Sequence, residues 1–338
     1  MDEQGFRVFL AKRQLAEKTV KAHMRIVKEF EKYLEKRNSN NTIDKAKPID
    51  FDDFSEILKK TGKDTIGNIQ ALARYAIFKN NKTLTVHVLE ITDGASVMEN
   101  LSRNLRQKVG EDKWKEIFVG IELPPLLTLP KDKPKTTKKV MERLETKLDK
   151  KRRREALLSN LHFVPDEAFI TYKKAFLESR NIDDFLQRRH AELVEELEEH
   201  SKNKTLCFTQ EVDHEVVEYV RAAPTCEAGV RDRNTIYVTK IPYMTKKYLH
   251  ESDERMKRYY ACHCPWVREA IKSGIKISPE FCYCSAGFEK RIWDVIFGRP
   301  VEAEVLQTVL KGDLICKFAI HIPKERIEYA KGSQRKKT

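Results

Sequence analysis

Near Lys204 the spacing of apolar residues changes from a helical to an extended pattern. The parts of the chain before and after this point are therefore expected to have different secondary structure. Before it, apolar residues recur at steps of three and four, as in Val20, Met24 and Val27, which indicates amphipathic helices. After it, the runs IYVTKIPY (236–243) and LICKFAIHI (314–322) are rich in β-branched and aromatic residues and predict strands. The chain is therefore expected to be all-α at the front and α+β at the back.

A length of 338 residues suits two or three folding units, so the fold class that we expect is multidomain. The predicted parts are an all-α N-terminal helical bundle over 1–95, a basic helical connector over 96–204, a cysteine-rich α+β ligand-binding domain over 205–325, and a basic disordered tail over 326–338. In the bundle we expect helices at 6–10, 19–37, 51–60 and 65–76, with Asp50 capping the third and Asp64 or Thr65 the fourth.

Two stretches of the bundle, FRVFLAKRQLAEKTVKAHMRIVKEFEKYLEKR (6–37) and DFSEILKKTGKDTIGNIQALARYAIF (53–78), share a pattern of short helices. The pattern resembles the SAM-like core-binding domain of phage integrases and other tyrosine recombinases. The resemblance implies contact with duplex DNA through phosphates, which position a protein without reading base sequence. The candidate DNA-binding residues are Arg13, Lys18, Lys21, Arg25, Lys28, Lys63 and Arg74.

A dimerisation or docking bundle is the alternative interpretation of these helices. Tyrosine recombinases carry an arginine three residues after a catalytic histidine, and none of the nine histidines here has one. We therefore expect no strand transfer, and the protein is not a recombinase.

The middle of the chain combines a proline-punctuated connector, IELPPLLTLP (121–130), with a strongly basic run over 131–155. The basic run holds 12 basic and 5 acidic residues, more than half of the net charge of +13. Met141, Leu144 and Leu148 give it a helical stripe, so its basic side chains are expected on an exposed helix that contacts a polyanion or is simply solvated. Further helices are expected at 167–178 and 183–200.

Seven cysteines, bunched as Cys262-His263-Cys264 and Cys282-Tyr283-Cys284, suit reduced thiols in the cytoplasm better than a secreted disulfide framework. Four thiolates brought together satisfy tetrahedral zinc, with an iron–sulfur cluster as the alternative. Buried structural thiols and redox chemistry are the other interpretations. His263 or His321 could add a nitrogen ligand.

Known catalytic and membrane signatures do not occur in the chain. No run approaches the roughly 18 apolar residues that a membrane helix needs, so no membrane partner is expected. The sequence also lacks a Gly-rich phosphate loop, a Gly-x-Ser-x-Gly elbow and a His-Glu-x-x-His helix, which argues against nucleotide hydrolysis, a serine esterase and a thermolysin-like protease.

The last part of the chain has five features in order along the sequence. They are a cysteine before a predicted helix, the segment Gly298-Arg299-Pro300-Val301, a predicted strand with Glu302 and Glu304, a Gly312-Asp313 turn, and Cys316-Lys317-Phe318. This pattern resembles the 4-vinyl reductase domain, the small-molecule-binding module of phenol-sensing regulators, and the related 2-amino-thiazoline-4-carboxylate hydrolase family. The resemblance implies a zinc site and an apolar pocket beside it. The family's middle cysteine is replaced here by Thr308.

The resemblance gives two sets of candidate residues. The metal set is Cys262, Cys264, Cys282, Cys284 and Cys316, and the aromatic pocket set is Tyr243, Tyr260, Trp266, Phe281, Phe288 and Trp293. Ordinary core packing is the alternative for each aromatic. The pattern favours a small-molecule- or metal-responsive protein. The alternative is a zinc-dependent hydrolase of a small cyclic or amide compound with Glu302 or Glu304 as base. The predicted partners are a small-molecule ligand, duplex DNA and a second copy of the chain.

Overall fold

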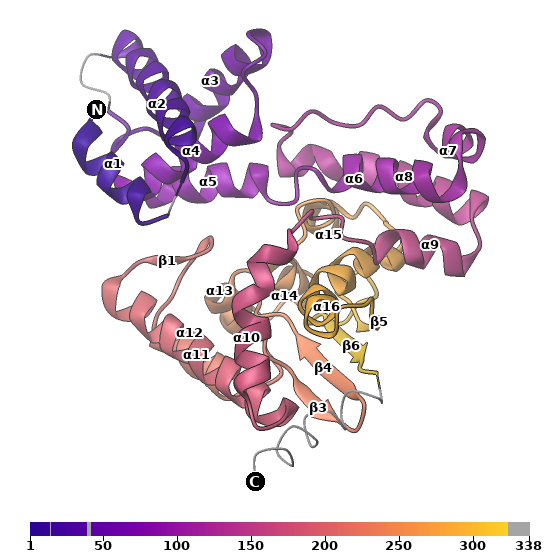
Figure 1. The fold of residues 1–338 in the computed structure, drawn as a ribbon. Helices are drawn as coiled ribbons and strands as arrows, with labels where there is room; N and C mark the ends of the chain where they lie inside the picture. Colours follow the sequence, from indigo (N-terminus) through magenta and orange to yellow (C-terminus); the bar gives the residue numbers. More distant parts are fainter. Residues whose placement is uncertain (14, 39–41, 324–338) are drawn as a thin grey trace. The chain divides into compact units, whose positions relative to one another are not determined.

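The computed structural model describes residues 1–13, 15–38 and 42–323 (Figure 1). It divides into two compact units, one made of Met1–Ala95 with Pro124–Pro130, the other of Ser96–Leu123 with the chain from Lys131 onward. Helices dominate, and a small antiparallel sheet lies in the C-terminal part. This confirms the expected combination of a helical N-terminal region and an α+β C-terminal region.

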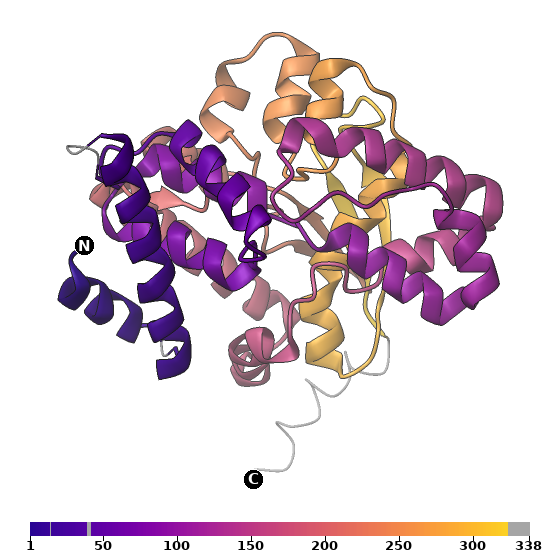
Figure 2. The same ribbon diagram turned by 90° about the horizontal axis from the view of Figure 1, so that it is seen from above.

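Unit 1 is a bundle of short helices (Figure 2). They are α1 (Glu3–Ala11), α2 (Glu17–Arg37), α3 (Pro48–Lys60), α4 (Ile66–Phe78) and α5 (Lys82–Thr92). Thr65 caps α4 as expected, because its hydroxyl accepts from the Asn68 N–H. The expected cap of α3 differs: Asp50 lies inside the first turn of a helix that begins at Pro48, and its carboxylate accepts from the Lys47 N–H.

The core of unit 1 is formed by the apolar stripe of α2 and the inner faces of the other helices. Phe6 packs edge-to-face on Tyr75 with ring centroids 4.8 Å apart, which joins α1 to α4. Leu127, from the proline-rich segment, is buried in the same core. Residues 124–130 are therefore part of the bundle's packing as well as a connection.

Unit 2 begins with four helices that were expected to form part of a separate connector. They are α6 (Val97–Val109), α7 (Glu111–Phe118), α8 (Lys133–Lys147) and α9 (Lys150–Leu157). Their apolar residues share one core with Trp266 and Phe281 from the C-terminal region, and the Thr137 hydroxyl donates to the Trp266 carbonyl at 2.9 Å. The structure therefore differs from the expected connector over 96–204, because the stripe of Met141 and Leu144 is covered by residues far along the chain.

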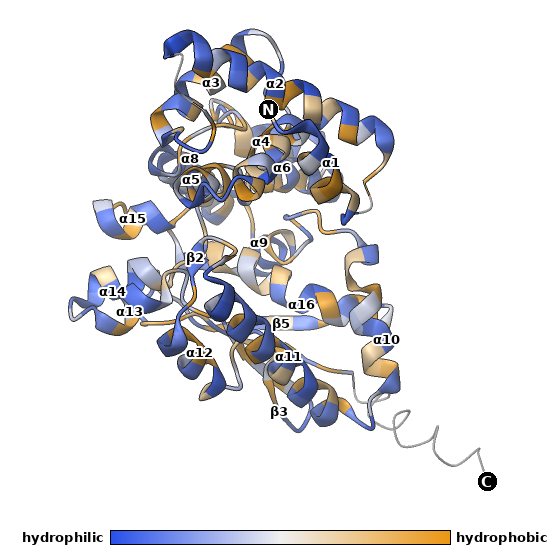
Figure 3. Cartoon of the chain, turned by 90° about the vertical axis from the view of Figure 1, so that its left-hand side faces the viewer, coloured by the Kyte–Doolittle hydropathy of each residue, from blue (hydrophilic) through white to orange (hydrophobic). Residues whose placement is uncertain are grey.

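Most basic side chains of α8 and α9 are exposed, as the sequence pattern indicates. Lys133 is an exception, since it is 1% exposed and its ammonium lies over the Trp266 ring, 5.4 Å from the centroid. Figure 3 shows the mixture of hydrophilic and hydrophobic residues that makes these helices amphipathic.

The remainder of unit 2 packs helices around the sheet (Figure 1). The helices are α10 (Ile170–Glu178), α11 (Ile182–Asn203), α12 (His214–Arg221), α13 (Thr245–His250), α14 (Glu254–Ala261), α15 (Arg268–Ser273) and α16 (Tyr283–Phe297). The strands are β1 (Leu206–Cys207), β2 (Gln210–Glu211), β3 (Val230–Asp232), β4 (Thr235–Thr239), β5 (Glu302–Gln307) and β6 (Lys317–His321). Strands β4 and β6 overlap the two predicted strand runs but are shorter: β4 begins one residue before the run 236–243 and β6 lies inside the run 314–322.

The four-stranded sheet has the order β3-β4-β6-β5 with every pair antiparallel. Val238 lies opposite Phe318, which lies opposite Val305, so one row of apolar residues crosses the sheet. Helix α16 covers this face and packs Ala286 and Trp293 against it. Because α16 is buried on several sides, it is the element that brings the sheet, α9 and α10 together.

No helix among the described residues is long and apolar enough to cross a bilayer. The predicted disordered tail over 326–338 lies outside the described residues.

Candidate functional site

Helix α16 positions the candidate site. It follows Pro279 and the short turn Pro279–Cys282, and it ends at Gly298, whose φ of 65° is a left-handed conformation that glycine adopts without strain. Cys282 is its N-cap and Cys284 is its second residue. Because residues two apart on a helix face different sides, the two thiols of this Cys-x-Cys pair diverge.

Four thiols lie within electrostatic range of one another, and we call Cys262, Cys264, Cys282 and Cys316 the thiol cluster. The Cys282 sulfur is 2.7 Å from the Thr308 hydroxyl. Burial raises the pKa of the Cys282 thiol well above its ordinary value, and Cys316 raises it further. Burial also raises the pKa of Cys262 and Cys316, so these three thiols are protonated near neutral pH.

The thiol cluster contains four of the five cysteines predicted to bind a metal. Among the residues that the structure describes, no three His, Cys, Asp or Glu side chains are arranged to hold a metal ion. Tetrahedral zinc needs four ligands at about 2.0–2.3 Å, and iron–sulfur clusters likewise need converging thiolates. Metal binding by the cluster therefore stays a prediction.

The remaining cysteines have different neighbours. The Cys284 sulfur is 3.6 Å from Nε2 of His162, which packs edge-to-face against Phe288. Cys226 lies in a separate core, where the Thr239 hydroxyl donates to its sulfur at 3.6 Å and burial raises the pKa of the thiol to about 11. Cys284 therefore contacts the His162 imidazole, whereas Cys282 contacts the Thr308 hydroxyl.

A buried ion pair lies next to the thiol cluster, formed by the Lys240 ammonium and the Glu289 carboxylate, 2.6 Å apart. Their side chains are 12% and 7% exposed. Burial alone lowers the pKa of Lys240, but the carboxylates of Glu289 and Glu227 outweigh it, so the pKa is raised. Burial raises the pKa of the Cys316 thiol and the Lys240 ammonium partly opposes that shift, which links the pair to the thiols.

His263, the residue between Cys262 and Cys264, belongs to the same interior. Its Nε2 donates to the Ile241 carbonyl, and its ring packs edge-to-face on Tyr243 with centroids 5.3 Å apart. Burial, followed by the charge of Lys240, lowers the pKa of His263 to about 3. The imidazole is therefore neutral and its Nδ1 is an acceptor.

A cavity of about 180 Å³ lies on the other side of Glu289. Aromatic side chains form most of its wall, and the polar groups that reach it are Arg189 and two carboxylates. The lining residues are Phe169, Tyr172, Arg189, Glu227, Val238, Phe288, Glu289, Ile292 and Trp293. At roughly 30 Å³ of liquid volume per water, the cavity has room for about six waters or one small organic molecule.

Arg189 is the cation of this cavity and lies on α11. Among the described residues no carboxylate is within ion-pair distance of its guanidinium, which donates to the Ala228 carbonyl at 3.5 Å. The guanidinium also lies 5.2 Å from the Tyr172 ring centroid. Burial lowers the pKa of Arg189, and the charges of Tyr172, Glu227 and Glu289 partly oppose this shift from beyond ion-pair distance.

Glu227 supplies the second carboxylate from a loop with unusual backbone geometry. Its φ of 55° is left-handed, a conformation that a non-glycine residue adopts at a cost. One carboxylate oxygen accepts from the Ile241 N–H at 3.2 Å, which fixes the side chain beside the cavity. Strain of this kind is concentrated at binding and active sites.

Two residues of the predicted aromatic pocket, Phe288 and Trp293, line this cavity. The other four lie elsewhere. Trp266 and Phe281 are core residues shared with α6–α9, Tyr243 packs against the Arg268 guanidinium at 4.1 Å, and Tyr260 packs against Tyr259 with centroids 5.6 Å apart. The predicted base candidates Glu302 and Glu304 are exposed on β5, and Glu304 is 3.4 Å from His321.

The predicted DNA-binding residues of unit 1 fall into two groups. Lys21, Arg25 and Lys28 are exposed and line a surface hollow of about 500 Å³ between α1 and α2. Arg13 and Lys18 are also exposed, and Lys63 pairs with Glu29 at 2.7 Å. Arg74 is only partly exposed and is directed to the buried His23. The basic hollow, rather than Arg74, is the part that can meet phosphates.

The polar residues of the cavity were not among the sequence candidates. Arg189 and Glu227 are 38 positions apart in the sequence and 50 or more from α16, and no local motif joins them. The only local signal is on α11, where Phe185 and Arg189 are four residues apart and so share one helix face.

Residues 195–328 match the model of a family of unknown function (DUF6144). No curated protein and no solved structure matches the chain.

Proposed function

We propose that unit 2 binds a small aromatic molecule that carries both a carboxylate and a nitrogen donor. The observation that carries the proposal is Arg189, a partly buried cation that forms no ion pair with a described carboxylate, at a cavity lined by four aromatic residues. Buried charges are costly unless they are paired, so a bound anion would supply what the protein lacks. Cavities with aromatic walls and a few convergent polar groups are typical ligand sites.

The other polar groups define the opposite end of the ligand. Glu227 and Glu289 reach the same cavity as acceptors, and they suit the N–H groups of an amine. Phe169, Tyr172, Phe288 and Trp293 supply ring faces and edges for an aromatic body. The cavity volume restricts the body to about one ring.

Calorimetry with 2-aminobenzoate tests this assignment. Benzoate, which carries only the carboxylate, and aniline, which carries only the amine, are measured beside it. We expect 2-aminobenzoate to bind more tightly than either of them. Arg189→Gln should weaken 2-aminobenzoate and benzoate about tenfold or more, the effect of a lost charge-assisted hydrogen bond, and leave aniline unchanged. Arg188→Gln, on the exposed side of the same helix, is the matched control. Equal binding of all three compounds would contradict the proposal.

Zinc binding is a second candidate, favoured by the mutual proximity of the four thiols. A bound ion would require these side chains to converge. Metal content measured beside the melting temperature decides the question. A ligand role predicts that Cys316→Ala loses zinc and several kcal/mol of stability, whereas a packing role predicts about 1 kcal/mol and no loss of metal. Cys226→Ala, a buried thiol in another core, is the control.

Contact between unit 1 and the phosphates of duplex DNA is a third candidate, supported by the exposed Lys21, Arg25 and Lys28. Binding should be weak, independent of base sequence and steeply reduced by salt. A gel-mobility series from low to high salt tests it. Lys21→Gln with Arg25→Gln should weaken binding, and Lys59→Gln with Lys60→Gln is the control at the same change of charge. No retardation at low salt would exclude this role.

A further inference from the structure

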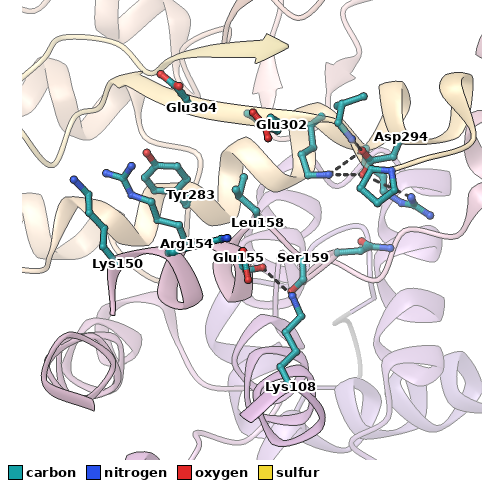
Figure 4. A pocket seen from close by; sticks show the side chains of 17 residues that line it. Lys108, Lys150, Arg154, Glu155, Leu158, Ser159, Tyr283, Asp294, Glu302 and Glu304 are labelled. Atoms are coloured by element: carbon teal, nitrogen blue, oxygen red, sulfur yellow. Dashed lines mark hydrogen bonds and ion pairs between the residues drawn. The ribbon is translucent and has the colours of Figure 1, made fainter. Parts of the chain in front are cut away.

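A large hollow lies on the surface of unit 2 and shares no lining residue with the cavity at Arg189. Its volume is about 860 Å³, within the range of small-molecule sites. Helices α9 and α16 and strand β5 form its walls, and Lys108 of α6 reaches its rim (Figure 4). We call it the α9–α16 groove.

The floor of the groove is apolar and is built on a close helix contact. Leu158, Tyr283, Val301 and Ala303 contribute to it. A Cβ on Gly287 of α16 would lie 2.7 Å from the Leu158 carbonyl oxygen, so only glycine allows the end of α9 to approach this closely. The groove therefore has a fixed base, and an apolar group placed there would be removed from water.

The basic side chains of the groove are not all neutralised. Lys290 binds Asp294 at 2.6 Å, and Arg154 binds Glu280 at 3.2 Å while lying 4.5 Å from the Tyr283 ring centroid. Lys150 and Lys151 make no ion pair with a described residue. Lys108 donates to the Glu155 carbonyl at 3.3 Å and lies beside Glu155 and Ser159, away from Lys150 (Figure 4). The ammonium groups of Lys150 and Lys151, at the start of α9, are thus available to an anion.

Four acidic residues line the groove: Glu155 on α9, Asp294 on α16, and Glu302 and Glu304 on the opposite side. Glu302 and Glu304 alternate along β5 with the inward-facing Ala303, so they project from the strand face that α16 does not cover. Figure 4 shows Lys150 and Arg154 on the α9 side of Tyr283 and the two glutamates on the strand. The α9 side therefore has a local excess of positive charge, and the β5 side does not.

We propose that the α9–α16 groove binds a phosphomonoester with an apolar body. A phosphate dianion with three terminal oxygens can accept from several cations at once, so it suits Lys150, Lys151 and Arg154 of α9 better than a single carboxylate does. The apolar body would lie on Leu158 and Tyr283. Arg154 is held in place by Glu280 and Tyr283, so it can contact the phosphate without first being ordered.

Fluorescence titration of the full chain with 1-naphthyl phosphate tests the proposal, with inorganic phosphate and 1-naphthol as its halves and 1-naphthoate as the carboxylate analogue. We expect 1-naphthyl phosphate to bind at least tenfold more tightly than any of the three. Binding should weaken as salt rises, because exposed charges are screened.

Variants then locate the binding. Lys150→Gln with Lys151→Gln should weaken 1-naphthyl phosphate by about tenfold to a hundredfold, the order expected for two charge-assisted contacts. Lys135→Gln with Lys139→Gln removes the same charge from exposed positions of α8 outside the groove and should have little effect. Arg189→Gln should also have little effect, which separates this groove from the interior cavity.

Three results would overturn the proposal. They are equal loss of affinity in the two double variants, equal binding of 1-naphthoate and 1-naphthyl phosphate, and binding no tighter than that of inorganic phosphate. Competition of 1-naphthyl phosphate by an oligoglutamate peptide at far lower concentration would also overturn it, in favour of an acidic protein partner.

Discussion

Both units bury polar side chains, but these side chains have different structural roles in the two units. In unit 1, Asn81 caps α5 and donates to the carbonyls of Ile43 and Ala46, and Asp50 closes the first turn of α3. These contacts complete local backbone structure. In unit 2, Lys240 and Glu289 join a strand end to the middle of a helix 49 residues away and complete no turn or cap.

This difference indicates which buried polar groups have a role other than stabilising the fold. A buried ion pair is weak evidence for stability, because hydrophobic residues of similar size often do as well or better. Perturbed and buried charged groups instead concentrate at functional sites. The contacts of Asn81 and Asp50 in unit 1 are accounted for by folding alone, whereas the Lys240–Glu289 pair of unit 2 is not.

Removing one partner of the buried pair should have the largest effect. Lys240→Met leaves Glu289 buried without its cation, and we expect a loss of about 3–5 kcal/mol in the free energy of unfolding. Lys240→Met with Glu289→Leu should recover most of it. All three tryptophans lie in unit 2, so urea unfolding followed by tryptophan fluorescence reports on that unit. A double variant as unstable as the single one would show that the pair is needed for folding.

Acid should affect unit 2 more steeply than unit 1. Burial lowers the pKa of His162 and His23 to about 4 and that of His263 to about 3, from an ordinary value near 6.5. The folded state then binds fewer protons than the unfolded state, so stability is complete above pH 6.5 and is lost as pH falls toward 4. Each histidine contributes a slope of about 1.4 kcal/mol per pH unit.

His162 and His263 are in unit 2 and His23 is in unit 1, so fluorescence should show about twice the slope of a probe of unit 1. Urea unfolding between pH 4.5 and 7 measures it. His263→Asn should flatten the fluorescence slope, and His23→Asn should leave it unchanged. Equal slopes in the wild type and the His263→Asn variant would contradict the assignment of a buried neutral imidazole.

The smallest expected effect on stability comes from replacing one helical glycine by alanine in each unit. Gly287→Ala in unit 2 places a methyl 2.7 Å from the Leu158 carbonyl oxygen, and overpacking of this kind costs about 1–3 kcal/mol. Gly67→Ala in α4 of unit 1 meets nothing within 4 Å and should stabilise by up to about 1 kcal/mol. Melting temperatures of the two variants should therefore shift in opposite directions. A neutral Gly287→Ala would show that α9 and α16 are free to move apart.

Sequence patterns locate elements well where the signal is local. Helix α2 begins two residues before its expected start and ends at its expected end, because its apolar stripe marks it. Strands β4 and β6 are found for the same reason, although the expected runs continue into loops. Local patterns do not show that α6–α9 belong to unit 2, because this depends on Trp266 and Phe281 packing against the apolar residues of those helices.

The candidate site shows the same limit. The aromatic residues Phe288 and Trp293 were expected at a pocket because they lie on the recognisable helix α16. Arg189 and Glu227 come from α11 and a strained loop, and only the tertiary fold places them together. The spacing of Cys282 and Cys284 suggests joint ligation, but a helix directs residues two apart to different sides, and this depends on where the helix begins.

The path of the chain between the units has a consequence for dissecting the protein. The backbone passes from unit 1 to unit 2 after Ala95, returns at Pro124, and leaves again after Pro130. A protease that cuts one of these passages therefore severs a single tether while the other two persist. A fragment that stops at residue 95 also lacks Leu127, so its core has a vacancy that the peptide 124–130, added in trans, should refill.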